Sequence, residues 1–94
     1  MAKRLGTQLF VSRLSPYTTT QKLEKLFSPF GVVREARLVR DPITRKPKGF
    51  GFVTFDSEDE AQKAIKTMDG RIVDGGLIFV EVAKSTEPSD NAGS

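Results

Sequence analysis

The sequence predicts an α+β fold in which a four-stranded antiparallel sheet carries two helices packed on one face. Four segments alternate apolar and polar residues as strands do, and two segments repeat apolar residues at the spacing of a helix. Their order is strand, helix, strand, strand, helix, strand, with short connections throughout. Each helix is long enough to cross back over the sheet, so both are expected on the same face.

The first strand and the first helix are predicted from the N-terminal third of the chain. Residues 9–14 (Leu-Phe-Val-Ser-Arg-Leu) read as a strand that Ser15-Pro16 closes. Threonines at 18–20 offer N-cap hydroxyls to the helix, and Gly31 stands where helices commonly end. The apolar positions that recur at helical spacing are Leu23, Leu26, Phe27 and Phe30.

The middle of the chain predicts two strands joined by a turn. Residues 32–39 form the second strand, whose buried side is expected to hold Val33, Ala36 and Leu38. Residues 41–47 contain two prolines and two cations and are typical of a turn. The third strand is residues 49–55, which are rich in aromatics.

The last helix and strand complete a β-α-β-β-α-β, ferredoxin-like sandwich. Ser57 and Glu60 form a capping box ahead of a helix that ends at residues 69–70. Residues 77–82 form the fourth strand. The apolar face of the helix consists of Ala61, Ala64, Ile65 and Met68. We therefore predict one domain at residues 8–84, a short basic lead at 1–7 and a disordered polar tail at 85–94.

Composition favours a binding protein over an enzyme. The 94 residues are 37% hydrophobic, which permits one two-layer core, and they include neither Cys nor His. The chain therefore lacks a thiol nucleophile, zinc–thiolate ligands and the usual general base at neutral pH. We expect no enzymatic activity, no cofactor and no metal ion. The same fold hosts phosphatases in other families, so the fold alone does not exclude an enzyme.

Strand alternation separates a face of the sheet that meets the helices from an open face. The residues expected toward the helices are Leu9, Val11, Val53, Phe55, Ile78, Val80 and Val82. Those expected on the open face are Phe10, Ser12, Arg37, Val39, Lys48, Phe50, Phe52, Thr54, Phe79 and Glu81. Four of the seven Phe thus face water, which costs them burial and indicates a ligand or partner.

Charge is divided unevenly along the chain. Residues 32–55 carry six basic and two acidic side chains, whereas residues 56–69 carry five acidic and two basic ones. A basic half beside an acidic helix suggests a surface that faces a polyanion, although a charged, soluble surface would explain the same balance. The acidic cluster at 56–60 is better explained by a helix N-terminus than by a metal site. The helix lysines are expected on solvated faces: Lys22, Lys25, Lys63 and Lys66.

Two segments resemble the signature motifs of the RNA recognition motif family. Residues 48–55, Lys-Gly-Phe-Gly-Phe-Val-Thr-Phe, match all eight positions of its octamer, and residues 9–14 resemble its hexamer. The resemblance covers about residues 8–84. It implies that bases stack on Phe10 and Phe52, that Phe50 packs against sugars, and that Lys48 pairs with a phosphate. The segment Ser-Pro-Phe-Gly at 28–31 is also similar to small and glycine-rich RNA-binding proteins of plants, although no glycine-rich tail follows.

Further contacts are expected both inside and outside the two motifs. The turn at 41–47 corresponds to a loop that often wraps over RNA, and the end of the last strand to a site where base edges are read. The expected phosphate or polar contacts are Arg13, Arg37, Arg45, Lys46, Lys48, Thr54, Glu81 and Lys84. Phe79 replaces the Arg or Lys of many relatives and would contact another base or a protein. Gly49 and Gly51 are expected to let the sheet pack tightly against the helices.

The sequence therefore predicts a monomeric module that binds single-stranded RNA in RNA processing or metabolism. An alternative is a protein–protein interaction module on the same fold, using the acidic second helix or Phe79. Single-stranded DNA stays open as a ligand, because only contacts to the 2′-hydroxyl separate it from RNA. No apolar stretch reaches the roughly 20 residues of a membrane span. Without an apolar leader the expected compartment is the nucleus or cytoplasm, or an organelle if a transit peptide has been trimmed.

Overall fold

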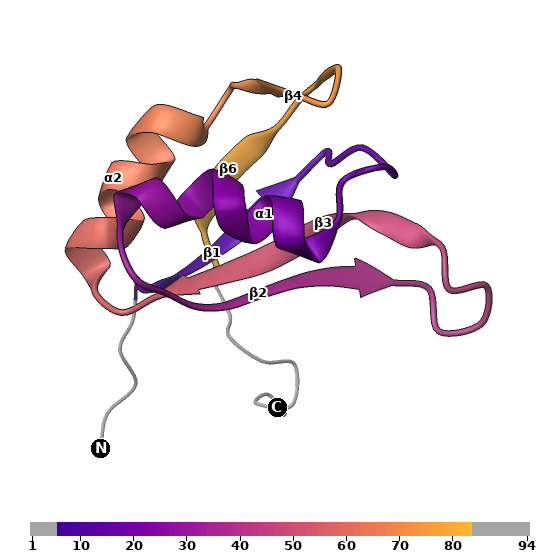
Figure 1. Cartoon of the computed structure of the whole chain (residues 1–94), viewed down its shortest axis with the longest axis horizontal. Coiled ribbons are helices and arrows are strands. Elements are labelled where there is room, and N and C mark those ends of the chain that lie inside the picture. Colours follow the sequence, from indigo (N-terminus) through magenta and orange to yellow (C-terminus); the bar gives the residue numbers. More distant parts are fainter. Residues whose placement is uncertain (1–5, 84–94) are drawn as a thin grey trace.

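The computed structural model describes residues 6–83 and has the predicted α+β architecture (Figure 1). The main sheet is antiparallel and has the strand order β2-β3-β1-β6. Its elements are β1 (Gln8–Ser12), α1 (Thr20–Phe27), a 3₁₀ turn η1 (Ser28–Phe30), β2 (Val33–Arg40), β3 (Pro47–Phe55), α2 (Glu58–Met68) and β6 (Phe79–Val82). A separate two-stranded hairpin is formed by β4 (Ile72–Val73) and β5 (Gly76–Leu77). Lys84 and the predicted tail at 85–94 lie outside the described residues.

The core lies between the sheet and the two helices, which cover the same face of the sheet (Figure 1). The predicted inward side chains of β1, β3 and β6 are confirmed, since all but the half-buried Val82 are at most 2% exposed. The helices contribute the buried side chains of Leu23, Phe27, Ala61, Ala64 and Met68. Because side chains alternate along a strand, this burial fixes which side chains lie on the open face.

Both helices begin at the predicted caps. The Thr19 side chain accepts a hydrogen bond from the Lys22 backbone N–H at 3.0 Å. Ser57 and Glu60 form the reciprocal capping box, with distances of 3.1 and 3.3 Å. α1 stops earlier than the apolar spacing indicates, because Pro29 has no N–H and its ring clashes with the carbonyl of the preceding turn. The chain continues instead as η1.

The last strand is shorter than the sequence predicts. Residues 77–82 are expected to form one strand, but Leu77 pairs with Ile72 in the β4–β5 hairpin. Ile78 then bonds to the segment that follows α2: its N–H donates to the Arg71 carbonyl and its own carbonyl accepts from Gly70, both at 2.9 Å. The backbone groups of Ile78 are thereby engaged outside the main sheet, and β6 begins at Phe79.

β2 occupies an edge of the sheet and is irregular. Its bounds are shifted by one residue from the predicted 32–39, and its register against β3 slips between Val33 and Glu35 and again between Leu38 and Arg40. The first slip lets Val33 and Ala36, three residues apart, both pack against the core. The expected inward residues of β2 pack against the core but are only half-buried.

The two glycines of the octamer have roles different from the expected packing against helices. Gly49 has φ +91°, a left-handed conformation that L side chains rarely adopt, and a Cβ added there would make only an ordinary contact, 3.8 Å from the carbonyl oxygen of Leu14. A Cβ added to Gly51 would lie 2.5 Å from the carbonyl oxygen of Arg37 on β2. The first glycine therefore shapes the bend of β3, and the second allows close approach of the neighbouring strand.

Candidate nucleic-acid interface

Three phenylalanines form a continuous aromatic surface on the two central strands. Phe10 of β1 pairs directly with Phe52 of β3, and the ring centroids are 5.6 Å apart. Phe50 lies 5.5 Å from Phe10 and 6.5 Å from Phe52. All three side chains are half-buried by one another and by their strands. Their placement on the open face confirms the alternation that the sequence predicts.

Phe79 extends the aromatic surface toward the edge strand β6. It is 42% exposed and pairs with Ser12, which pairs on its other side with Phe50. The guanidinium carbon of Arg13 lies 5.6 Å from the centroid of the Phe79 ring. Arg13 has φ +63°, so the chain turns sharply as it leaves β1. The aromatic and cationic groups that the sequence singled out at these two positions are therefore in contact.

A second cation lies at the opposite side of the aromatic surface. Arg37 of β2 pairs with Phe52, and its guanidinium carbon is 5.1 Å from the centroid of that ring. Its Nε is also 3.6 Å from a carboxylate oxygen of Glu35. Since both arginines are exposed, each ring–cation contact contributes about 0.5–1 kcal/mol. The surface is thus bordered by a guanidinium on each side.

One row of side chains crosses the whole open face. The strand register places Arg37, Phe52, Phe10 and Glu81 next to one another on β2, β3, β1 and β6. A cation, two rings and a carboxylate acceptor succeed one another along this row. The arrangement offers a charge for a phosphate, faces for stacking, and an acceptor for an exocyclic amine or a hydroxyl.

Gln8 is an open-face residue that the sequence analysis did not single out. Its Nε2 donates to the hydroxyl oxygen of Thr54 at 3.4 Å across the β1–β3 pair. The Oε1 atom is buried, and no described group donates a hydrogen bond to it. Gln8 lies two residues before Phe10 and four before Ser12, so the same alternation in the sequence could have placed it on the open face. Thr54 is therefore already engaged by a neighbouring side chain before any ligand arrives.

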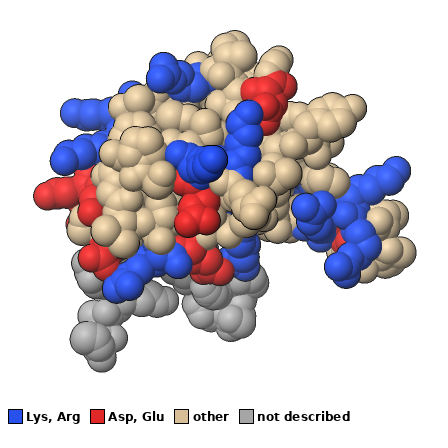
Figure 2. Space-filling view, viewed as in Figure 1, with Lys and Arg blue, Asp and Glu red and all other residues tan. Residues whose placement is uncertain are grey.

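The β2–β3 loop is held in a closed turn by its first residue. The Asp41 carboxylate accepts from the N–H groups of Thr44 and Ile43 at 3.0 and 2.8 Å, and the Asp41 carbonyl accepts from the Arg45 N–H at 2.8 Å. The two hydrogen bonds to the carboxylate hold the pKa of Asp41 below its usual value, and the bond from the Thr44 N–H has the larger effect. Both Arg45 and Lys46 are exposed. Figure 2 shows basic side chains gathered on this projecting loop.

Lys48 lies between the loop and the aromatic surface. It is exposed near the start of β3, and its charge contributes to the lowered pKa of Asp41. Glu81 is also exposed, on β6. The structure thus brings Arg37, Phe52, Phe10 and Glu81 into one row and leaves Arg45 and Lys46 on the loop beyond the sheet.

The comparisons with known proteins agree with this geometry. Residues 9–78 match the sequence model of the RNA recognition motif. The chain belongs to the RNA recognition motif family. The fold observed here, with its four-stranded antiparallel sheet and two helices on one face, is the fold of this family.

Two plant proteins are similar to this RNA recognition motif along nearly its whole length. Small RNA-binding protein 11, chloroplastic, from Arabidopsis thaliana is 44% identical over 89 residues, which are 95% of this chain. Organelle RRM domain-containing protein 2, mitochondrial, from the same organism is 42% identical over 86 residues, or 92% of this chain. The chain spans only 61% and 55% of the lengths of these two relatives.

A solved structure of an RNA complex is similar as well. The structure described as the Sxl-lethal protein/RNA complex superposes on this RNA recognition motif with a TM-score of 0.77 and 32% sequence identity. The match covers 82% of this chain and 47% of that one. At this identity the likeness extends beyond the fold to a family relationship.

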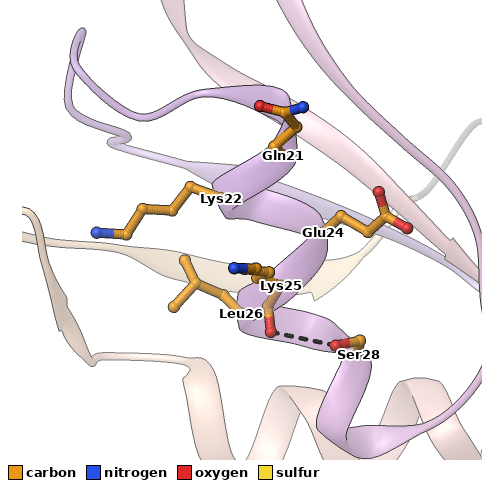
Figure 3. Close-up of a pocket in the computed structure, with 6 residues that line it drawn as sticks. All are labelled: Gln21, Lys22, Glu24, Lys25, Leu26 and Ser28. Atoms are coloured by element: carbon orange, nitrogen blue, oxygen red, sulfur yellow. Dashed lines mark hydrogen bonds between the residues drawn. The ribbon is translucent and has the colours of Figure 1, made fainter.

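The helix-covered side of this RNA recognition motif has a hollow of about 750 Å³ along α1 that does not form a site (Figure 3). Its labelled side chains come from one helix and the turn after it, and they diverge: Lys22 and Leu26 point to one side and Glu24 to the other. The Lys22 side chain lies on the exposed helix surface that the sequence predicts, and its ammonium is 2.6 Å from a carboxylate oxygen of Asp74. Together with Thr18, Lys22 holds the pKa of Asp74 below its usual value.

The described part of this domain contains neither a metal-binding cluster nor a membrane-spanning helix. Among residues 6–83, no three acidic side chains lie together in a group that could hold a metal ion. No helix within the same range is long and apolar enough to cross a membrane. The acidic first turn of α2, Glu58 to Glu60, occupies the helix N-terminus, where carboxylates interact favourably with the helix dipole.

Proposed function

We propose that this domain binds single-stranded RNA across the open face of its sheet, with bases stacked on Phe10 and Phe52. The observation that carries the proposal is the contiguous, half-exposed aromatic surface of Phe10, Phe50 and Phe52. Stacking a base on an aromatic side chain contributes about 1–3 kcal/mol and tolerates any sequence. Two or three stacked bases on a single module give modest affinity with limited sequence preference.

Basic side chains around the rings supply the phosphate contacts in this proposal. Lys48 lies beside the rings on β3, while Arg37 and Arg13 border them on β2 and after β1. Arg45 and Lys46 extend the positive charge onto the β2–β3 loop (Figure 2). Glu81 is placed to accept a hydrogen bond from a base edge or a ribose 2′-hydroxyl next to Phe10. The latter contact would favour RNA over single-stranded DNA.

The relatives support this reading and suggest where the protein acts. Their names describe a small RNA-binding protein of chloroplasts and an RRM domain-containing protein of mitochondria, and one similar solved structure is described as a protein/RNA complex. We therefore place the protein in RNA processing or metabolism within an organelle rather than in the nucleus or cytoplasm. The domain acts as a monomeric binding module without catalytic activity of its own.

The alternative of a protein-interaction module has weaker support. On the acidic helix α2, Glu60 is committed to the capping box and its side chain fills the space beside Gly31. Phe79 lies beneath the Arg13 guanidinium, an arrangement that suits a stacked base as well as it suits a protein side chain. A ring–cation pair that continues an aromatic surface favours the nucleic-acid reading.

An NMR titration tests the proposal directly. Isotope-labelled protein is titrated with a randomised single-stranded RNA pool and, in parallel, with the matching DNA pool. We expect amide shifts centred on Phe10, residues 48–55 and residues 79–82, larger with RNA than with DNA, while Ile72 on the opposite face stays unmoved. An unmoved sheet in a folded protein would overturn the proposal. Equal shifts with both pools would rule out the proposed 2′-hydroxyl contact but would still agree with base stacking.

A further inference from the structure

A second concave surface lies on the helix-covered side of the molecule, between α1, η1, the end of α2 and β4. This groove is widely open to solvent and has a volume of about 760 Å³. Its floor is apolar and is formed by Leu26, Phe30 and Met68, with Ile72 at the edge. Lys25 and Arg71 also line it. A volume of this size lies within the range of about 300–1,000 Å³ that is typical of ligand pockets.

The groove exists because two chain segments depart from regular structure. Pro29 ends α1 and turns the chain into η1, which carries the half-buried Phe30 to the groove. The β4–β5 hairpin buries Val73 in the core, so the preceding Ile72 points outward and is 68% exposed. Burial of such an exposed apolar side chain against a partner would contribute favourable free energy to binding.

The charges of the groove have one sign. Both ionisable side chains that line it, Lys25 and Arg71, are basic, and neither forms an ion pair with any residue in the range 6–83. Three other cations of the described residues are paired, among them Lys22 with Asp74 at 2.6 Å and Arg34 with Asp56 at 2.9 Å. Figure 2 looks onto this side of the molecule, where basic and acidic side chains are both interspersed with uncharged surface.

We propose that this groove binds a short peptide segment of a protein partner, in which bulky apolar side chains are flanked by Asp or Glu. The apolar floor would take the bulky side chains, and Lys25 and Arg71 would pair with the carboxylates. The groove offers no row of open aromatic faces for stacking, which makes RNA a poor occupant.

The groove and the aromatic surface lie on opposite sides of the sheet, since the helices cover one face only (Figure 1). A peptide in the groove and a ligand on the open face could therefore be held at the same time. The peptide site does not depend on the proposed RNA binding, and either can fail without the other.

Synthetic peptides of defined composition serve as probes for the test. The first alternates glutamate with leucine and phenylalanine, the second replaces each glutamate by lysine, and the third replaces each apolar residue by serine. Each is titrated into isotope-labelled protein. We expect only the first peptide to shift the amides of Leu26, Phe30 and residues 68–73, while the amides of β1 and β3 stay unmoved.

Charge reversal then tests the two cations. The variants Lys25→Glu and Arg71→Glu should each lower the affinity for the glutamate-containing peptide by about tenfold, because each removes an attraction and adds a repulsion. The matched control is Lys63→Glu, which reverses an exposed lysine of α2 that does not line the groove and should leave the affinity unchanged. Ile72→Asp should also weaken binding, and its exposure means that the fold tolerates the change.

Several results would overturn the proposal. Equal binding of the lysine-containing peptide would show that charge does not select the occupant, and equal binding of the serine-containing one would show that the apolar floor is unused. Shifts of the groove amides with RNA would assign the groove to nucleic acid. Shifts that depend on protein concentration alone would assign it to a second copy of this chain.

Discussion

The guanidinium carbon of Arg37 lies 5.1 Å from the centroid of the Phe52 ring, on the neighbouring strand of the open face. Before any ligand is present, the contact already joins the cation that we propose for a phosphate to the ring that we propose for a base. A base that stacks on Phe52 must either displace the guanidinium or slide beneath it. In the second case the base would be held between a ring and a cation, both of which stack on nucleobases.

Replacing Phe52 by Ala should weaken RNA binding while the domain stays folded. The loss of one stacking contact, about 1–3 kcal/mol, corresponds to about a fivefold to 150-fold rise in Kd. Fluorescence anisotropy with a labelled single-stranded RNA measures the change, and circular dichroism checks the fold. Ile72→Ala, a change of an exposed apolar residue on the opposite side, is the control and should leave Kd unaltered. Unchanged affinity in Phe52→Ala would show that this ring does not stack a base.

RNA binding should weaken steeply as the salt concentration rises. For single strands the logarithm of the affinity falls by about 0.7 per phosphate contact for each decade of salt. Each of the variants Arg37→Gln and Lys48→Gln should therefore flatten the slope by about 0.7, if each side chain neutralises one phosphate. Lys63→Gln on α2 carries the same charge change and should leave the slope intact. A slope near zero in the parent protein would rule out phosphate contacts as a source of affinity.

Arg13 and Phe79 should act together in RNA binding. Because their contact sets a cation beside a ring, we expect both to hold the same base, and Arg13→Gln should weaken binding by about twofold to fivefold, the equivalent of an exposed cation–π interaction between Arg13 and that base. In a Phe79→Ala background the same change should have a smaller effect, because the ring is already gone. A double-mutant cycle of RNA affinities measures this coupling. Fully additive losses would mean that the two side chains contact the RNA independently.

Gly51→Ala should destabilise the domain strongly, although it adds only one methyl group. The added Cβ would lie 2.5 Å from the carbonyl oxygen of Arg37, so β2 would have to move. We expect a loss of about 1–3 kcal/mol in the free energy of unfolding, as for other overpacked sites. Chemical denaturation measures it, and Gly76→Ala, where the nearest outside atom is 4.0 Å away, serves as the control. Equal stability of the two variants would contradict the close approach of β2.

Acid should loosen the β2–β3 loop before it unfolds the sheet. The folded pKa of Asp41 lies below the ordinary 3.8, because the N–H groups of Thr44 and Ile43 bind its charged form. A lowered folded pKa stabilises the turn above the ordinary value, and this contribution is lost as pH falls through the folded pKa. An NMR pH titration should show the amides of Ile43 and Thr44 shifting below about pH 4, while those of Phe10 and Phe52 stay unmoved. In Asp41→Asn this transition should vanish.

Period-two alternation in the sequence predicted the aromatic surface correctly. Leu9 and Val53 are buried, so their neighbours Phe10 and Phe52 are forced onto the opposite face. The caps at Thr19 and Ser57 were also predictable, because a cap is formed by residues three positions apart. By contrast, the Arg37–Phe52 contact depends on which residue of the irregular strand β2 lies opposite β3, and no spacing along the chain reveals that register.

The order of the elements, the faces of the central strands and the family can all be predicted from the sequence, because they depend on residues close together in the chain. Only the folded structure reveals the ring–cation pairs, the need for a glycine at position 51, the short β6 and the groove beside Ile72. Each of these arises where segments distant in sequence meet. Their geometry follows from register slips and from competition for backbone hydrogen bonds, as at Ile78. Local patterns select the elements, and packing decides which side chains touch.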